Sequence, residues 1–320
     1  MCANVNSCRK YINRRRSTRS EGGPRNILIV DSHTHILPDE FRDQRERWLA
    51  ADRTFSALFN DTAALTASSE DLITEMDEAG VDVSVAMGYG WTDPDAARLS
   101  NDYLLAAAVE YPGRIVPFCS VDPSWGDAAL KEVERCLSSG ASGIGELHAD
   151  TQGWSPEQAE GLRGIMALAS EAAVPVLVHA SEPVGHGYPG KGATTPERLL
   201  TLAGSFPDVA FIFAHFGGGL PFYALMPEVA ETLSNVYFDS AATPFLYRPD
   251  VYAVSAAAAG SDRILFGSDF PLIRQGRAMR GVRGSGLNDA DIERVLGENL
   301  VDLLGLKSDS GTSDSTGQPR

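Results

Sequence analysis

The chain has 320 residues, and its 43% hydrophobic and 22% charged residues are typical of a globular protein with a sizeable core. This composition excludes a fully disordered chain, and no apolar run approaches the roughly 20 residues that a membrane-spanning helix needs. The 27 Lys and Arg against 43 Asp and Glu give a formal net charge of −16 at pH 7. Because such a surface repels phosphate backbones, we expect no nucleic-acid partner and no membrane partner.

The two ends of the chain differ from its middle. Residues 1–25 are rich in Arg and Ser, and residues 307–320 form a polar low-complexity tail. We expect a disordered basic arm, a single domain over residues 26–306 and a disordered tail. A secretory signal requires an apolar stretch after its positively charged residues, and no such stretch follows these arginines. The four cysteines match no zinc-binding spacing, so we expect reduced thiols in a cytoplasmic protein.

Short β-branched runs recur through the middle of the chain, separated by segments with helical patterns. The runs are almost continuously apolar, as strands buried on both faces of a parallel sheet are. They span residues 27–31, 81–87, 115–121, 143–148, 175–179, 209–215, 236–240 and 264–269. Eight strand–helix units predict an α/β fold, a (β/α)8 barrel. The alternative, a doubly wound open sheet, usually has fewer strands and a Gly-rich turn after the first, where this chain has DSHTH.

Local signals predict several features between the strands. Ser68–Asp71 has the pattern of a capping box, and Thr195–Glu197 and Ser155–Glu157 each predict a helix start with proline in the first turn. The segment from Leu37 to Leu65 is too long for a simple crossover and carries several large aromatic residues. We therefore expect an inserted cap over the barrel mouth after the first strand.

Side chains that bind metals gather at the ends of the predicted strands. They are five of the six histidines, His33, His35, His148, His179 and His215, together with Glu146 and Asp269. Active sites of such barrels lie at the carboxyl ends of the strands. His33 and His35 also project from the same side of an extended chain. Because imidazole and carboxylate groups bind Zn²⁺ and similar ions, the pattern predicts a metal site in the barrel mouth.

Seven segments resemble the amidohydrolase superfamily, and within it the amidohydrolase-related group that includes aminocarboxymuconate-semialdehyde decarboxylase. They are Asp31–His35 (DSHTH), Val121–Pro123 (VDP), Gly143–Glu146 (GIGE), Val178–Pro183 (VHASEP), Ala214–Gly218 (AHFGG), Gly267–Pro271 (GSDFP) and Glu298–Leu304 (ENLVDLL). The resemblance runs from about Ile27 to Leu304. It implies a metal-dependent barrel enzyme that acts on a small molecule.

The metal ligands that the resemblance implies are His33, His35, His179 and Asp269. For His215 it implies either a ligand role at a second metal or the role of a catalytic imidazole. Glu146 separates two alternatives, because binuclear members carry a bridging carboxylate at the fourth strand, whereas decarboxylase-like members often lack it. The set therefore fits one ion or two, most readily Zn²⁺, with Mn²⁺ or Fe²⁺ as alternatives.

Glu146 favours a metal-dependent hydrolase as the first hypothesis. A metal-activated water would attack an amide, a lactone or another ester of a small carboxylate-bearing molecule. Asp269 would accept the proton of that water, and His215 would stabilise the developing oxyanion. The alternative is a metal-dependent, non-oxidative decarboxylase or related carbon–carbon lyase with the same ligands. A non-catalytic barrel, a third hypothesis, predicts a degraded ligand set.

Four further residues are candidates for substrate binding. Lys191 and His186 belong to a long Gly-rich loop at residues 181–195, beside the predicted metal. Arg274 follows the GSDFP segment, where it is placed to clamp a carboxylate with two hydrogen bonds. Trp91 follows the second strand and is placed to line the pocket. Barrels of this kind commonly pair, so we also expect a homodimer.

Overall fold

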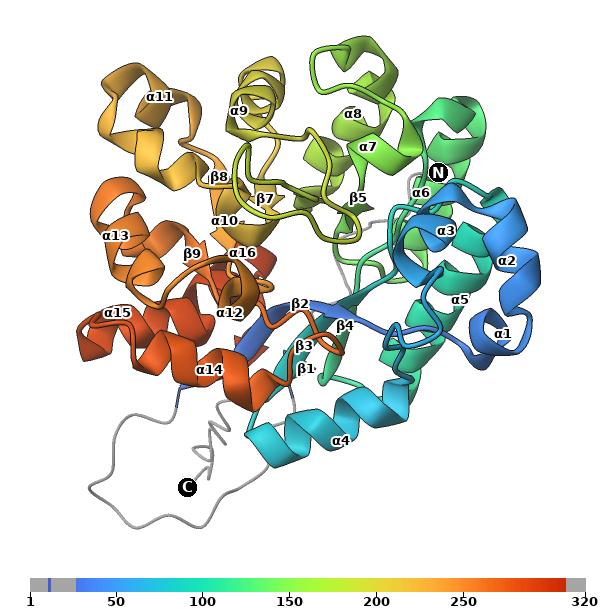
Figure 1. Ribbon diagram of the computed structural model, residues 1–320, viewed down its shortest axis with the longest axis horizontal. Coiled ribbons are helices and arrows are strands. Elements are labelled where there is room, and N and C mark those ends of the chain that lie inside the picture. The colour runs from blue at the N-terminus through green and yellow to red at the C-terminus, as the bar shows by residue number, and fades with distance from the viewer. Residues whose placement is uncertain (1–10, 13–26, 309–320) are drawn as a thin grey trace, which may run out of the picture.

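The computed structural model describes residues 11–12 and 27–308 and has an α/β fold in which all paired strands are parallel (Figure 1). One sheet has the order β2-β3-β4 and a second has the order β5-β6-β7-β8-β9. These strands are β2 (Val30–His35), β3 (Val83–Met87), β4 (Ile115–Pro117), β5 (Ile144–Leu147), β6 (Val176–Val178), β7 (Phe211–Phe213), β8 (Val236–Asp239) and β9 (Ile264–Leu265). Each overlaps a predicted run.

The two sheets are joined to each other on both sides. Cys119, just after β4, forms a single parallel bridge with Ile144 of β5, and Thr34 of β2 forms another with Phe270, which follows β9. The backbone N–H of His35 also donates to the Phe270 carbonyl at 2.7 Å. Strand neighbours therefore follow the chain order from β2 to β9, and the first of them lies beside the segment after the last.

Helices lie around the outside of the strands (Figure 1). They are α1 (Asp39–Asp43), α2 (Arg45–Ala51), α3 (Arg53–Phe59), α4 (Ser69–Ala79), α5 (Pro94–Glu110), α6 (Asp127–Ser138), α7 (Ala149–Gln152), α8 (Arg163–Ala172), α9 (Pro196–Ser205), α10 (Ala214–Gly217), α11 (Pro227–Thr232), α12 (Thr243–Leu246), α13 (Asp250–Ala259), α14 (Gln275–Arg283), α15 (Asp289–Glu293) and α16 (Asn299–Leu304). Short 3-10 turns and one π-helical turn over 294–298 complete the set.

The predicted helix starts are confirmed at two of three places. Ser68 and Asp71 form the expected capping box of α4, and α9 begins at Pro196. The start predicted at Ser155–Glu157 is wrong, because α8 begins only at Arg163. The side chains of Ser155 and Glu157 instead accept hydrogen bonds from the Arg198 guanidinium of α9, at 3.1 and 2.8 Å.

Alternate residues along a strand belong to different parts of the core. Val83 and Val85 of β3 pack with apolar residues of the neighbouring strands, whereas Ala86 joins the large cluster under the helices. A third cluster lies within the segment after β2, where Trp48 and Phe55 are almost fully buried. This alternation is the pattern expected for strands covered on both faces.

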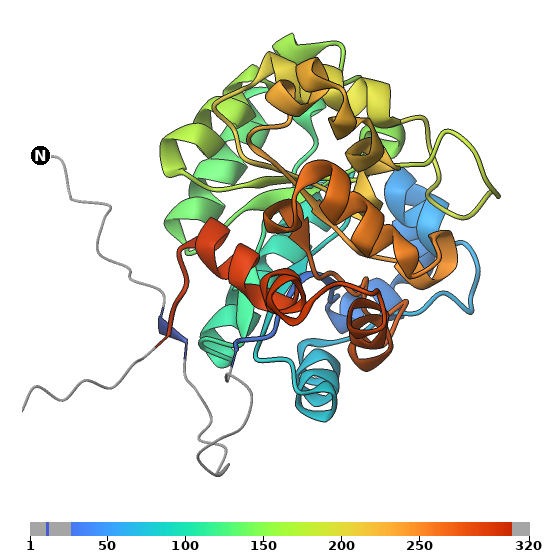
Figure 2. The ribbon, with the colours of Figure 1, turned by 90° about the vertical axis from the view of Figure 1, so that its left-hand side faces the viewer.

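The loop at residues 181–195 and α1–α3 lie at the same end of the molecule, on the right in Figure 2. At the opposite end β1 (Tyr11–Ile12) pairs in parallel with β10 (Lys307–Ser308). Apart from these pairs, the predicted basic arm and polar tail lie outside the described residues. Within the described ranges, none of the helices combines the length and apolar character needed to cross a membrane.

Candidate metal centre

A cavity of about 510 Å³ contains all the side chains predicted to bind metal. It lies at the carboxyl ends of the strands, and its inner end is lined by the buried residues His33, His35, Glu146, His148, His179 and His215 and by the partly buried Asp269. This volume is within the range of small-molecule sites in proteins. The structure thus brings together residues that are spread over most of the sequence.

The six predicted ligands form two adjoining groups of three. The first group is His33, His35 and Asp269, and the second is Glu146, His179 and His215. Within each group the candidate ligand atoms lie within 4.8 Å of one another. The groups also approach each other, since His35 Nε2 lies 3.8 Å from Glu146 Oε2 and 3.4 Å from Asp269 Oδ1. This geometry has room for one ion or for two.

Asp239, at the end of β8, orients the first group. Its Oδ2 accepts a hydrogen bond from His33 Nδ1 at 2.9 Å, and its Oδ1 accepts from the backbone N–H of His215 and Ala241. His33 Nε2 then faces His35 Nε2 at 3.0 Å. Burial lowers the pKa of His33, but Asp239, together with the more distant Glu146 and Asp269, outweighs burial and raises this pKa to about 10. The position therefore favours positive charge, which a divalent ion supplies.

Glu146 stands in the same relation to His179. Its Oε1 lies 2.9 Å from His179 Nδ1, and the pKa of Glu146 is held well below its usual range, mainly by His179 and against the effect of burial. His179 Nε2 is buried without a hydrogen-bond partner among the described residues. A carboxylate that accepts Nδ1–H and leaves Nε2 for the ion is a common arrangement in metal proteins. The unpartnered nitrogen thus fits a metal ligand.

The tautomer of His215 follows from its neighbour. His215 Nδ1 donates to the Ala241 carbonyl at 3.0 Å, which leaves Nε2 as the atom that can accept a proton or a metal. The residue has a left-handed backbone (φ 56°, ψ 45°). A run of glycines follows it, and a Cβ at Gly218 would collide with the Ser181 carbonyl. The AHFGGG sequence therefore lets the chain turn tightly beside the loop that follows β6.

Asp269 closes the site from the last strand. Its backbone N–H donates to the His33 carbonyl at 2.9 Å, so its position is tied to the first strand. Burial raises the pKa of Asp269, but hydrogen bonding to His35 and the nearby imidazoles lower it to about 2. The carboxylate is therefore ionised and suited to bind a cation.

Two residues of the site have no role in the sequence-based prediction. Asp239 carried the same signal as Asp269, a carboxylate at the end of an apolar strand, in the sequence VYFDS. Tyr89 lies two residues after the end of β3, and its ring stacks on that of His35 with the ring centroids 4.0 Å apart. Nothing in the local pattern distinguished Tyr89 from the other aromatic residues.

A family model described as Amidohydrolase matches residues 30–306, nearly the whole described domain. The chain belongs to the amidohydrolase family. The 2-amino-3-carboxymuconate-6-semialdehyde decarboxylase of Dictyostelium discoideum is 22% identical over 339 residues, which cover 87% of this chain and 92% of that protein. The gamma-resorcylate decarboxylase of a Polaromonas species is 22% identical over 260 residues, covering 66% and 77%.

Solved structures of amidohydrolase-superfamily decarboxylases share this fold. The 5-carboxyvanillate decarboxylase of Sphingomonas paucimobilis has a TM-score of 0.73 at 14% identity, covering 88% of this chain and all of that one. The corresponding enzyme of Novosphingobium aromaticivorans, complexed with manganese and a nitrobenzoic acid, has a TM-score of 0.71 at 18% identity, covering 88% and 97%. These structures support the fold, and the family match over residues 30–306 confirms the sequence-based resemblance.

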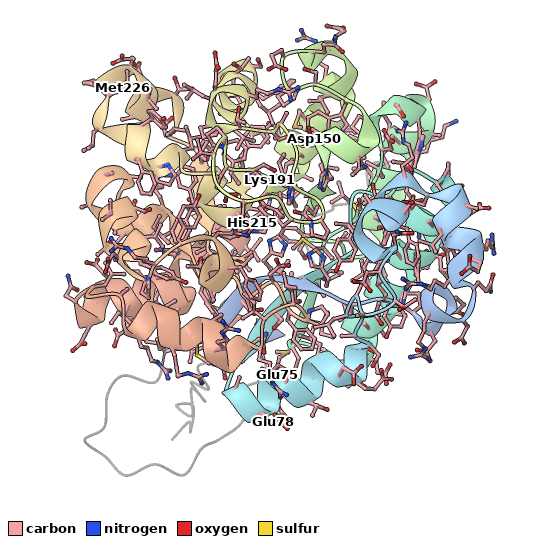
Figure 3. The ribbon with its side chains drawn as sticks, viewed as in Figure 1. Glu75, Glu78, Asp150, Lys191, His215 and Met226 are labelled. Carbon is pink, nitrogen blue, oxygen red and sulfur yellow. The ribbon has the colours of Figure 1, made fainter. Side chains whose placement is uncertain are left out.

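Three of the four predicted substrate-binding residues do not line the cavity of this amidohydrolase. Arg274 is 67% exposed, and its guanidinium pairs with Glu75 and Glu78 at 2.6 Å each. Figure 3 shows these glutamates on α4 at the edge of the molecule, away from His215. The prediction of a carboxylate clamp at Arg274 is therefore wrong, because the acidic face of α4 attracts its side chain.

Lys191 and Trp91 are also corrected by their surroundings. The Lys191 ammonium donates to the Val184 and His186 carbonyls of its own loop, at 2.8 and 2.9 Å. Trp91 is fully buried and packs against Phe41. Neither side chain lines the cavity, whereas His186 does, so a substrate-binding role for His186 stays a prediction.

Carboxylates fix the amidohydrolase loop at residues 181–195 beside the cavity. Asp150 accepts hydrogen bonds from the Ala193 N–H and the Thr194 hydroxyl, each at 2.8 Å. Glu182 accepts from the hydroxyls of Tyr188 (2.8 Å) and Tyr247 (3.2 Å). Figure 3 shows Asp150 beside this loop, with Lys191 on the loop itself.

His148 connects this loop to the metal site. Its ring stacks on His179 with centroids 4.2 Å apart, and its Nε2 lies 3.1 Å from the Gly190 carbonyl. The residue is only 2% exposed. Its ring therefore packs against the imidazole of His179, a candidate ligand.

Asp239→Asn should weaken metal binding by about 10- to 100-fold, because the neutral amide no longer makes the His33 imidazole a strong ligand. The affinity can be measured by competition with a chromophoric chelator. Asp262→Asn, at an exposed aspartate that pairs with Arg263, is the matched control. Equal affinities of the two variants would show that Asp239 does not support the metal.

Proposed function

We propose that the protein is a metal-dependent, non-oxidative decarboxylase that acts on a small carboxylate-bearing molecule. The hydrogen bond between Glu146 and His179 Nδ1 is the observation that carries the proposal. It gives Glu146 a positioning role in place of the bridging role that favoured a hydrolase. The similarity to two curated decarboxylases supports the same choice. The order of the two hypotheses drawn from the sequence is therefore reversed.

We further propose that the eight strands form a closed (β/α)8 barrel and that α1–α3 cap its mouth. The bridges on both sides of the two sheets support closure. Leu58 and Phe59 of α3 and the residues after them line the cavity, which supports the cap. The cap would exclude water from the reacting end of the cavity.

One divalent ion fits the ligand set His33, His35, His179 and Asp269. The 3.0 Å separation of two facing imidazole nitrogens and the unpartnered His179 Nε2 support this set. Manganese in a structural neighbour supports Mn²⁺ as a candidate beside the Zn²⁺ expected from the ligand types. When bound, such an ion would anchor the substrate's oxygen atoms and stabilise negative charge on them.

The side chains of this protein then supply a proton and exclude water. Decarboxylation breaks the bond between the carboxylate group and the substrate carbon that bears it. That substrate carbon keeps the electron pair and takes up a proton, and the carboxylate leaves as carbon dioxide. His215 Nε2 is the atom that delivers this proton, since Nδ1 stays bonded to the Ala241 carbonyl. Asp269 is charge-coupled to His215 and balances the positive imidazolium.

The proposal is tested by incubating the Mn²⁺-loaded protein with two panels of compounds. One panel contains phenolic carboxylates such as 2,6-dihydroxybenzoate, and release of carbon dioxide is measured. The other contains lactones, esters and amides, and hydrolysis is measured. We expect turnover in the first panel only. Turnover confined to the second panel would contradict the decarboxylase proposal and support the hydrolase hypothesis.

Glu146→Gln should retain one metal ion per chain and lose no more than about tenfold in activity. The Gln carbonyl oxygen can still accept the hydrogen bond from His179 Nδ1, so the ligand keeps its orientation. Metal content by elemental analysis and the rate of carbon dioxide release are the measurements. A binuclear hydrolase would instead lose a bridging ligand, and with it one ion and nearly all activity.

A further inference from the structure

The outer half of the cavity differs from its inner half in polarity. Its walls carry mainly apolar side chains: Leu58, Phe59, Ala63, Ala64, Leu65, Pro189, Ala242, Phe245, Leu246, Pro271 and Leu272. Leu65, Phe245 and Leu272 are 57%, 49% and 50% exposed, which places them at the opening. A ligand held by the metal centre at its inner end would therefore contact apolar surface at its outer end.

Among the described residues that line the cavity, none is a lysine or an arginine. The basic side chains nearby are engaged elsewhere. Arg45 donates to the backbone carbonyls of Phe59 and Asp61, and Lys191 donates to carbonyls of its own loop. The guanidinium of Arg277 lies over the Phe245 ring, 5.4 Å from its centroid. Apart from the histidines, the walls offer no cation to a ligand.

Asp61 adds negative charge to this outer wall. It follows α3, is exposed and lines the cavity, and its Oδ1 accepts a hydrogen bond from the Ala63 N–H at 2.9 Å. This hydrogen bond holds the carboxylate in place. A second anionic group at this opening would lose part of its water beside apolar side chains and would meet the like charge of Asp61 without a cation to compensate.

We propose, on the basis of the decarboxylase function above, that the substrate carries a single carboxylate on a planar, largely apolar body. Its carboxylate end lies at the metal centre, and its body lies between Phe59, Phe245 and Leu246. Asp61 acts as a specificity-determining residue that rejects a second carboxylate at the outer end. The preference for a monoacid depends on charge and not on shape. A neutral group of the same size as a carboxylate would fit at the outer end without repulsion from Asp61.

Three matched ligands test the proposal by calorimetric binding to the Mn²⁺-loaded protein. They are 2-hydroxybenzoate, 2-hydroxybenzene-1,4-dicarboxylate and the 4-methyl ester of that diacid. We expect the monoacid and the ester to bind with similar affinity and the diacid to bind about tenfold more weakly. Equal binding of the diacid and the ester, or failure of all three to bind, would overturn the proposal.

Substitutions at Asp61 test the residue itself. Asp61→Asn removes the charge and keeps the acceptor for Ala63, and Asp61→Arg adds a cation at the same place. The ratio of the monoacid affinity to the diacid affinity should fall in Asp61→Asn, and it should fall by at least about tenfold in Asp61→Arg. Asp208→Arg changes an exposed aspartate outside the cavity by the same charge and should leave the ratio unchanged. An equal effect of Asp208→Arg would assign the preference to net charge.

The two proposals fail in distinguishable ways. Binding of these ligands needs no turnover, so a protein that prefers the monoacid but releases no carbon dioxide from any phenolic carboxylate contradicts only the proposed reaction. A protein that decarboxylates diacids and monoacids equally well contradicts only the charge selection.

Discussion

Removal of the divalent metal by a chelator should lower the rate of decarboxylation by at least about 10³-fold, and added Mn²⁺ should restore it. Without the ion, His33 Nε2 and His35 Nε2 face each other at 3.0 Å beside ionised Asp269, and no divalent charge is present to bind the substrate carboxylate and stabilise the negative charge that develops on it. The measurement is carbon dioxide release before chelation, after it and after reconstitution, together with the metal content of each sample.

The circular dichroism spectrum of the chelated protein is the control, because an unfolded chain would also be inactive. We expect a native spectrum, since the apolar clusters of the fold do not include the ligands. Full activity in a sample shown to contain no metal would overturn the proposed chemistry. The reconstituted protein should contain one ion per chain, which separates the proposed arrangement from a binuclear centre.

His215→Asn should lower kcat by about 10²- to 10⁴-fold, the usual contribution of a proton-transferring side chain. Asparagine suits the position, because it tolerates the left-handed backbone that His215 adopts (φ 56°) better than most residues. Its amide can also donate to the Ala241 carbonyl. Single-turnover rates across a pH series report the loss directly, and metal content should stay unchanged.

His186→Asn is the matched control for this variant. His186 lines the same cavity, but it is exposed in the loop at residues 181–195, away from the buried ligands. It should affect KM more than kcat. If His215→Asn lost its metal, His215 would be a ligand, and if its kcat fell less than tenfold, another group would deliver the proton.

The strand pattern of this fold was predictable because burial on both faces leaves a simple signal. All eight predicted runs overlap a strand of the structure, and the predicted ligands lie at or near the carboxyl ends of those strands. The boundary of the first run was the least accurate: it was predicted at residues 27–31, but β2 spans Val30–His35. Its polar residues are buried at the metal site, so hydrophobicity alone placed the strand too early.

The residues that touch the outer cavity were less predictable, because their positions depend on loop paths and on distant partners. Arg274 is held by glutamates of α4, almost 200 residues earlier in the chain. Lys191 is held by its own loop, and Trp91 by the aromatic cluster after β2. Asp239, by contrast, was accessible to the same argument that identified Asp269. A single sequence therefore shows which polar residues lie at strand ends. It does not show which of them contact a metal and which, like Asp239, orient another side chain.

The joining of first and last strands has a consequence for how the chain folds during synthesis. Asp31 accepts hydrogen bonds from Ser268 N–H and, across 244 residues of chain, from the Gln275 amide, and His33 and Asp269 meet at the same seam. A growing chain that ends before this seam holds His33 and His35 without Asp269, the carboxylate of their group of three. If the proposed ligand set is correct, high-affinity metal binding requires translation of the last strand, and a bound ion would then stabilise this long-range contact.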